Sequence, residues 1–333
     1  MRLSISQWSL RLFLFVCLLA VAGESFAQRR PQPSPTPPPP DEQTVTTFIR
    51  RVRLPITVVD KKGEFVDDLT QSDFQVFEDK VAQTIETFSN DLGEALPLYV
   101  AVLMDTSAST EGKLKFEQES ALNFIYTVVR PRRDRVLFAT FDDEINLRQD
   151  FTDKLELLNR AVTGVKQTGR HTALFDAVWL FCDEKLRSVV GRRVLVVITD
   201  GEDTYSRASI RDAIDIAQRT ETTIFAISTK AGFTATVPGV EAGQARSKKD
   251  NELVKLAEET GGAAFFTGDM ITLERSFTRI SKELRAQYLI TYKPLNDSYD
   301  GSFRKIEVKL ASRNGLKVRT KQGYRAIADS VRP

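Results

Sequence analysis

The chain has 333 residues, which is enough for one large domain together with a smaller one. Hydrophobic residues make up 41% of the sequence, an ordinary share that allows a full hydrophobic core. The formal net charge is only +2, with acidic and basic residues interspersed, so the sequence lacks the concentrated basic face that binding to nucleic acid or to an anionic membrane requires.

The N-terminal residues have the pattern of a secretory signal. Two arginines and a nearly unbroken apolar run over residues 12–22 precede the small-residue site Ser25-Phe26-Ala27. The run is shorter than the about 20 apolar residues that a membrane-spanning helix needs, which favours cleavage over a retained anchor. We therefore predict a signal peptide over residues 1–27 and an exported protein, periplasmic or secreted to the cell surface, with no transmembrane segment in its mature chain.

A proline-rich linker follows over residues 28–43 and is expected to form an extended, stiff tether. Residues 44–95 then have β patterns. The longest is Phe48–Val59, which is rich in β-branched residues, although Pro55 within it indicates an edge strand or a bulge. Two shorter strands are predicted at Phe74–Asp79 and Thr84–Phe88, separated by a turn.

The pattern changes at Pro97. Leu98–Met104 is a continuous apolar run, typical of a strand buried on both faces. Strand and helix patterns then alternate, with strands at 135–141, 145–151, 193–199, 223–228 and 263–267 and helices at 115–129, 154–165, 172–186, 209–219, 251–260 and 273–286. Strands separated by helices predict an α/β domain over residues 96–286, with a doubly wound, mostly parallel sheet covered on both faces.

The C-terminal flank returns to β patterns, with strands predicted at Tyr288–Tyr292, Phe303–Leu310 and Leu316–Thr320. Neither flank has enough strands to bury a core by itself. We therefore predict that residues 287–328 pair with residues 44–95 in one smaller β-sandwich, into which the α/β domain is inserted. Two separate β appendages are the alternative.

Two further features have a structural interpretation. Cys182 is the single cysteine outside the signal peptide and lies on an apolar helical face, so we expect a buried core thiol rather than a reactive one. The polar stretch over residues 230–250 is too long for a plain connection, and it is either functional or disordered.

Oxygen-bearing side chains follow the predicted strands where a ligand would bind. Asp105, Ser107 and Ser109 come directly after the first buried strand, Thr172 lies at the start of a helix, and Asp200 follows the strand at 193–199. Ligands of open parallel α/β sheets bind at the carboxyl ends of the strands. Helix capping is the alternative explanation, because each segment precedes a helix. Convergence of three segments favours a metal site over capping.

The ligand types indicate which cation would bind. Carboxylates and hydroxyls are hard oxygen ligands, which suit Mg²⁺, Mn²⁺ or Ca²⁺ rather than zinc. With two carboxylates and three neutral hydroxyls, the cation stays electron-poor, and an open position can accept a carboxylate from a partner. Mg²⁺ keeps its waters until a good ligand displaces them, so it is the first choice.

The motifs that contain these residues resemble those of a known domain family. Residues 98–286 resemble a von Willebrand factor type A domain, the fold also found as the integrin I domain, through DTSAS at 105–109, HTALFDA around Thr172 and ITDGED around Asp200. The resemblance implies a metal-ion-dependent adhesion site whose five positions all match. In that family the three hydroxyl positions tend to bind the metal directly, and the two aspartates act partly through water. The whole chain, with its flanking β segments, also resembles a group of exported bacterial proteins.

Other polar residues near the predicted site allow two interpretations each. His171, the only histidine, lies beside Thr172 and either contacts a ligand or is an exposed loop residue. Glu202 and Asp203 either enlarge a negative patch or belong to a solvated loop. The pair Asp142-Asp143 is interpreted as a turn.

Three functions are compatible with these patterns. The favoured one is a binding module that captures an Asp or Glu carboxylate of a protein partner through the cation, with no small-molecule cofactor. The helix at 273–286 is then a candidate for movement, by analogy with the integrin I domain. A structural subunit of a cell-surface or envelope assembly, with loops stabilised by the metal, is the first alternative. A metal-dependent hydrolase is disfavoured, because the sequence lacks a second histidine, clustered carboxylates and an activated nucleophile.

Overall fold

The computed structural model describes residues 51–90, 96–108, 113–166, 169–199, 203–229, 248–266, 270–311, 313 and 315–327. The predicted signal peptide, the proline-rich linker and nearly all of the 230–250 stretch lie outside these ranges. Within them, no helix is both long and apolar enough to cross a lipid bilayer.

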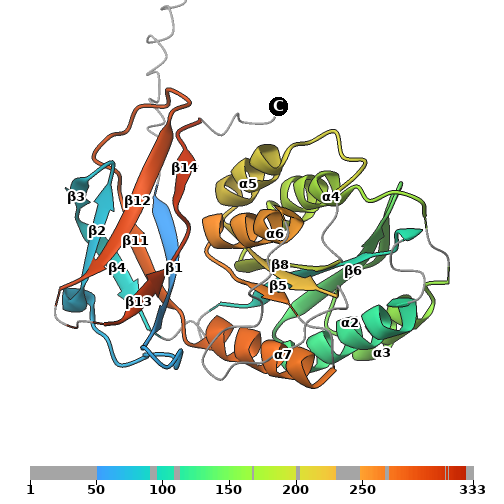
Figure 1. Ribbon diagram of the computed structural model, residues 1–333. Helices are drawn as coiled ribbons and strands as arrows, with labels where there is room; N and C mark the ends of the chain where they lie inside the picture. The colour runs from blue at the N-terminus through green and yellow to red at the C-terminus, as the bar shows by residue number, and fades with distance from the viewer. Residues whose placement is uncertain are drawn as a thin grey trace, which may run out of the picture. The chain divides into compact units, whose positions relative to one another are not determined.

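A six-stranded sheet in the order β10-β9-β8-β5-β6-β7 forms the centre of the α/β domain (Figure 1). All neighbouring strands are parallel except β6 and β7, which are antiparallel. The strands are β5 (Leu98–Asp105), β6 (Arg135–Phe141), β7 (Ile145–Thr152), β8 (Arg192–Thr199), β9 (Thr222–Ser228) and β10 (Ala264–Phe266). The prediction of a mostly parallel sheet is therefore confirmed, as is the more polar edge strand β7.

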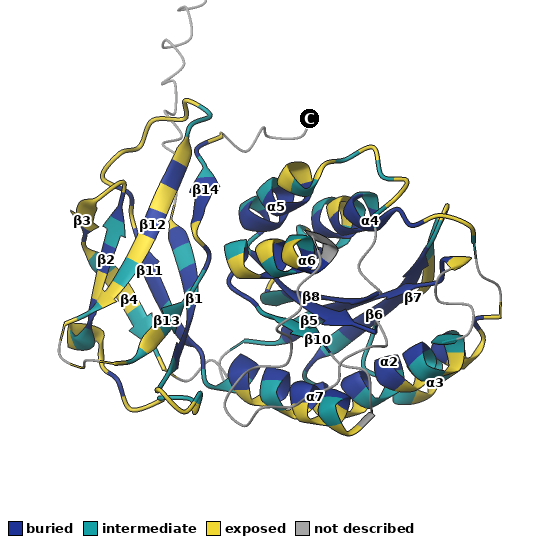
Figure 2. Ribbon diagram, viewed as in Figure 1, coloured by how far each residue is buried: buried dark blue, intermediate teal, exposed yellow. Residues whose placement is uncertain are grey.

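Helices cover both faces of this sheet. One face is covered by α2 (Leu114–Val128), α3 (Leu155–Thr163) and α7 (Met270–Arg285). The other face is covered by α4 (Leu174–Leu180) with its continuation, the π-helix η3 (Phe181–Leu186), and by α5 (Ile210–Arg219) and α6 (Lys248–Glu259). The central strands β5, β6, β8 and β9 are consequently buried, while the outer helix faces stay exposed (Figure 2).

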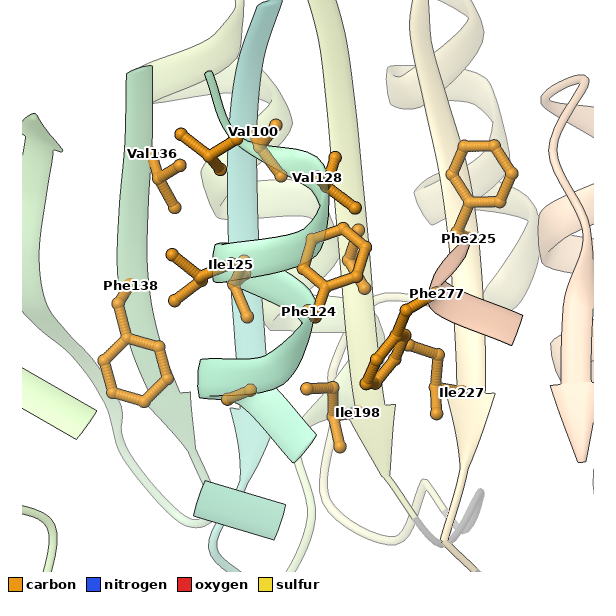
Figure 3. Close-up of a cluster of buried hydrophobic side chains, with 14 of the residues drawn as sticks. Val100, Phe124, Ile125, Val128, Val136, Phe138, Ile198, Phe225, Ile227 and Phe277 are labelled. Atoms are coloured by element: carbon orange, nitrogen blue, oxygen red, sulfur yellow. The ribbon is translucent and has the colours of Figure 1, made fainter. Parts of the chain in front are cut away.

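Side chains of β5 alternate between these two faces, because successive residues of a strand point to opposite sides. Val100, Val102 and Met104 belong to the core under α2 and α7, whereas Ala101 and Leu103 belong to the core under α4 and α5. Figure 3 shows the first of these cores, where α2 and α7 bring aromatic rings against the strands. The continuous apolar run in the sequence reflects burial on both faces.

The remaining strands form a β-sandwich of two four-stranded sheets, in the orders β13-β1-β11-β4 and β14-β12-β2-β3. The N-terminal flank supplies β1 (Val52–Val59), β2 (Phe74–Glu78), β3 (Val81–Gln83) and β4 (Ile85–Ser89), and a 3-10 turn, η1 (Gln71–Asp73). The C-terminal flank supplies β11 (Tyr288–Tyr292), β12 (Phe303–Leu310), β13 (Lys317–Arg319) and β14 (Gly323–Arg325).

Each sheet of the sandwich contains strands from both flanks. β1 pairs with β11 and β13, and β2 pairs with β12, so the predicted pairing of the two flanks is confirmed. The interpretation of β1 as an edge strand is wrong, because it lies between two neighbours. Pro55 is tolerated because β13 pairs only with Thr57–Val59, which leaves no ladder bond on that side at the proline.

Two short strands, β3 and β14, were not predicted. Each has only three residues, too few for an alternating pattern to be recognised. Cys182 is fully buried, and burial raises the pKa of its thiol to about 12. The thiolate is therefore scarce at neutral pH, in agreement with a structural cysteine.

Candidate metal-binding site

Asp105 is the last residue of β5, and its side chain is fully buried. Its Oδ1 accepts a hydrogen bond from the backbone N–H of Ser107 at 2.9 Å, and its Oδ2 accepts one from the Thr199 hydroxyl at 2.6 Å. Thr199 ends β8, the strand next to β5. The carboxyl ends of the two strands are thus tied together at the point where the chain leaves β8 toward residue 200.

Two members of the predicted ligand set, Ser109 and Asp200, lie outside the described residues, and so does Glu202. The described members are Asp105, Ser107 and Thr172. Each of the three is at most 3% exposed. Their oxygen atoms are therefore withdrawn from bulk water, as ligands of a largely desolvated cation would be.

The loop that carries Thr172 is fixed against the residue between Asp105 and Ser107. The N–H of Gly169 donates to the carbonyl of Thr106 at 2.8 Å, and the Thr106 hydroxyl donates to Asp142 Oδ2 at 2.6 Å. The N–H of residue 173, directly after Thr172, donates to the carbonyl of Asp142 at 3.0 Å. Asp142 therefore connects the loops after β5 and before α4.

Asp143 holds the same loop from the other side. Its Oδ1 accepts the N–H of His171 at 2.6 Å, and its Oδ2 accepts the N–H of Arg170 at 3.2 Å. Asp142 and Asp143 do form the predicted turn between β6 and β7, where the N–H of Asp142 donates to the carbonyl of Glu144. Their second role, positioning the Thr172 loop, was missed, because these contacts join residues about 30 positions apart in the sequence.

Thr172 is anchored through its backbone. Its N–H donates to the Thr204 hydroxyl at 3.0 Å, and its carbonyl accepts the N–H groups of Thr204 at 2.9 Å and Tyr205 at 3.0 Å. None of these bonds uses the hydroxyl of Thr172. The side-chain oxygen that the ligand set requires is thus not consumed in holding the loop.

Neither of the two following α-helices, α2 and α4, has a described member of the set at its N-cap. α2 has Lys113 at its N-cap, six residues beyond Ser107, and no side chain caps it. At the start of α4, the N–H groups of Leu174 and Phe175 donate to Asp203 Oδ1 at 2.9 and 3.3 Å. Asp203, not Thr172, therefore caps that helix, a role that neither sequence interpretation, a negative patch or a solvated loop, included.

Asp203 is shielded from solvent by this role. Burial raises the pKa of its carboxyl group, against the opposing effect of hydrogen bonds from the Ser206 hydroxyl and from the backbone of α4. Ser206 and Asp176 add further bonds between the same two segments. The loop after residue 202 is consequently attached firmly to the first turn of α4.

His171 is exposed and stacks on Tyr205, with ring centroids 5.1 Å apart and ring planes 11° from parallel. Tyr205 is itself 55% exposed. The pair borders Thr172, because His171 precedes it in the chain and the N–H of Tyr205 bonds to its carbonyl. This arrangement presents a flat aromatic surface next to one predicted ligand.

The donor set fits a hard divalent cation. It mixes carboxylates with hydroxyls, which suits Mg²⁺ and similar ions. The residues that the structure describes contain no group of three or more His, Cys, Asp or Glu side chains able to hold a metal, so a histidine- or cysteine-rich site has no support among them. A set of two aspartates and three hydroxyls needs no such group.

Comparisons with known proteins give the family. No curated protein matches the chain. Among solved structures, the chain is similar to an aerotolerance-related membrane protein from Bacteroides fragilis, at 14% identity over 56% of this chain and 98% of that one, with a TM-score of 0.44. It is also similar to the PilB minor pilin from Streptococcus sanguinis, at 13% identity over 58% and 62% of the two chains, with a TM-score of 0.43.

A third similar structure is proximal thread matrix protein 1 from the mussel byssus, with zinc in its metal-ion-dependent adhesion site (MIDAS) motif. Identity to it is 16%, coverage is 62% of this chain and 49% of that one, and the TM-score is 0.45. The model of the von Willebrand factor type A domain matches residues 100–279, which is more than half of the 333 residues. The chain therefore belongs to the von Willebrand factor type A domain family.

Proposed function

We propose that this protein is an exported binding module that holds a protein partner through one divalent cation, most favourably Mg²⁺. The proposed ligands are Asp105, Ser107, Ser109, Thr172 and Asp200. When bound, the cation would supply an electron-poor position that accepts an Asp or Glu carboxylate of the partner. The protein would act by binding and not as an enzyme, outside the cytoplasm.

The observation that carries this proposal is the arrangement of oxygen donors at one edge of the sheet. Asp105 ends β5, and Ser107 follows it in the next loop. Thr199 ends β8, directly before residue 200, and bonds to Asp105. Asp142 holds the segment of Thr172 against the loop that follows β5. The N-caps of α2 and α4 are Lys113 and Ala173, and Asp203 caps α4, so capping of these two helices does not explain why Asp, Ser and Thr occupy these positions. A shared cation explains all of them.

The neighbouring groups support a binding role. Thr106 and Asp142 hydrogen-bond to each other, so these polar groups fix loops rather than activate a nucleophile. His171 stacks on Tyr205, and its backbone N–H binds Asp143. In this arrangement the ring of His171 serves as part of the surface around the cation and not as a general base.

Capture of the partner from an envelope or culture extract tests the proposal. The wild-type protein should retain a partner in Mg²⁺, release it in EDTA and recapture it when Mg²⁺ is restored. Asp200→Ala should not capture it, whereas Asp150→Ala, a matched change at an exposed ion pair on β7, should behave as the wild type. Retention in EDTA and by Asp200→Ala would contradict metal-bridged capture.

The same experiment distinguishes metal-bridged capture from the main alternative, a structural subunit. If the metal only stabilised loops of a structural subunit, EDTA would lower the thermal midpoint while the partner stayed bound. Under our proposal, release of the partner occurs at temperatures where circular dichroism shows the protein still folded.

A further inference from the structure

A small cavity of about 30 Å³ lies between the β-sandwich and the α/β domain, away from the predicted metal ligands. The sandwich contributes Arg53 from β1 and Leu289 from β11 to its lining, and the α/β domain contributes Arg192 and Arg193 from β8, and Glu221. A space of this size holds one or two particles as large as a water molecule.

The charges around the cavity do not balance. Among the lining residues that the structure describes, three guanidinium groups face one carboxylate, and Arg53 already pairs with that carboxylate, with its Nε 2.9 Å from Glu221 Oε2. Arg193 donates to the backbone carbonyls of Val189 and Thr220. Arg192 donates to the neutral side-chain oxygen of Gln287 at 2.5 Å. The hydrogen bonds of these two arginines thus go to neutral acceptors, while Asp134 acts on Arg192 and Glu221 on Arg193 electrostatically.

Burial makes this imbalance costly, since charges withdrawn from water normally need an opposite charge nearby. Burial lowers the pKa of Arg192 to about 10; Asp134 opposes this change, and the positive charges of Arg130 and Arg285 add to it. Burial also lowers the pKa of Arg193; Glu221 opposes this, and Arg53 adds to it. The guanidinium groups around the cavity thus lie in an environment that favours the arrival of an anion.

The size and the walls of the cavity determine which anion fits. Pro55, Val194 and Leu289 contribute apolar surface beside the guanidinium groups. Such a site suits a monatomic, weakly hydrated ion better than a phosphate group, which needs more space and more hydrogen-bond donors. We propose that this cavity binds one halide-like inorganic anion, chloride in the natural setting, which joins the sandwich to the α/β domain through Arg53 and Arg192.

Crystals of the protein grown or soaked in sodium bromide test the site directly. Data collected at the bromine absorption edge should show one anomalous peak within the cavity, in contact with the guanidinium groups of Arg192 and Arg53. A cavity without an anomalous peak, at a bromide concentration where surface sites are occupied, would overturn the proposal.

Thermal unfolding tests anion binding in solution. At constant ionic strength, replacing sodium gluconate by sodium chloride should raise the thermal midpoint saturably, by on the order of 3 °C, because the anion binds only the folded state. Bromide should act as chloride does. An equal midpoint in gluconate and chloride would overturn the proposal, and it would do so even if a bromide peak were present, since the ion would then be adventitious.

Variants that remove either a positive or a negative charge from the lining give a further test. Arg53→Gln and Arg192→Gln should lose the chloride-specific shift, whereas Glu221→Gln should reach the shift at a lower chloride concentration, because it removes the carboxylate of the described lining. Arg325→Gln is the matched control, since it removes an ion pair between Arg325 of β14 and Asp215 of α5, neither of which lines the cavity. An unchanged shift in Arg53→Gln, the most exposed of these arginines, would contradict the assignment even if Arg192→Gln failed to fold.

Discussion

Thr199, at the end of β8, donates its hydroxyl to Asp105 Oδ2, at the end of β5, over 2.6 Å, and both residues are fully buried. The bond joins two adjacent strands at their carboxyl ends, shortly before Ser107 in the chain on one strand and directly before residue 200 on the other. It also supplies a hydrogen-bond donor to a carboxylate that is withdrawn from water. Such bonds behind a metal ligand fix its direction and tune its affinity.

The first prediction concerns this bond. Thr199→Val keeps the size of the side chain but removes the donor, so it should lower the free energy of unfolding by about 1–3 kcal/mol in EDTA. It should also weaken Mg²⁺ or Mn²⁺ binding by about 10–100-fold. Urea unfolding and isothermal titration calorimetry measure the two effects. Thr199→Ser keeps the hydroxyl and should stay near the wild type; equal losses in both variants would show that the bond is not the cause.

Gly169 is the second position to test. A Cβ added to Gly169 would lie 2.5 Å from Cγ of Asp142, whose carboxylate is held by the Thr106 hydroxyl. Gly169→Ala should therefore displace Asp142, lower the free energy of unfolding by about 1–3 kcal/mol and weaken metal binding through the Thr172 loop. Gly301→Ala is a control for the loss of a glycine, since nothing lies within 4 Å of its Cβ position, although its own φ of +73° adds backbone strain. Unchanged metal affinity in Gly169→Ala would contradict the role of Asp142.

Asp203 gives the third prediction. Asp203→Ala removes the cap of α4 and should cost about 1 kcal/mol of stability, whereas Asp203→Asn keeps an acceptor for the same N–H groups and should cost less. Thermal and urea unfolding at neutral pH compare the two variants. A larger loss in Asp203→Asn than in Asp203→Ala would show that the charge, and not the cap, matters.

The pH dependence at Asp203 follows from the direction of its pKa shift. Because burial raises its pKa in the folded state, the folded chain binds the proton more tightly than the unfolded chain does. This group therefore contributes stability at low pH, and the contribution is lost as the pH rises from the ordinary Asp value through the raised one. In a difference curve of unfolding free energy against pH, the wild type minus Asp203→Asn should fall over that interval; a rise would contradict the assignment.

A fourth prediction concerns the junction of α7 and the sandwich. Glu283 of α7 is fully buried, forms an ion pair with Arg319 of β13 and accepts the Thr57 hydroxyl at 3.2 Å. Arg319→Met should leave the buried carboxylate without its cation and lower the free energy of unfolding by about 2–4 kcal/mol. Arg51→Met, at a surface pair with Glu86, should cost less than about 1 kcal/mol. If urea unfolding showed similar losses of unfolding free energy in Arg319→Met and Arg51→Met, the buried ion pair of Glu283 would not stabilise the fold more than a surface pair does.

The sequence predicted the elements that are long or uniform. β5 and β8 are eight-residue apolar strands, and their patterns identified both the sheet and its carboxyl edge. The pairing of the two flanks was also predictable, because neither could bury a core alone. The three-residue strands β3 and β14 were missed, since a pattern of period two needs more residues to be recognised.

In the candidate site, too, some features were predictable from the sequence and others were not. The residues at the strand ends were nominated by their type and position, which depend only on local sequence. The contacts that hold them were not foreseen, because Asp142, Asp143 and Asp203 reach the Thr172 loop from segments about 30 residues distant. Aspartates of this kind look like turn or loop residues in the sequence, and only the packing of the loops reveals what they bind.

Calorimetric titration of the metal-free protein with Mg²⁺ and Mn²⁺ tests the central claim most directly. We predict one binding site per chain, with affinity lowered at least about tenfold in Thr172→Ala, because a ligand is lost while the backbone bonds of residue 172 remain. Thr163→Ala, which removes an exposed hydroxyl on α3, should bind as the wild type does. Absence of binding by the folded wild type, or equal affinity in Thr172→Ala, would contradict the proposed cation site and the partner capture that depends on it.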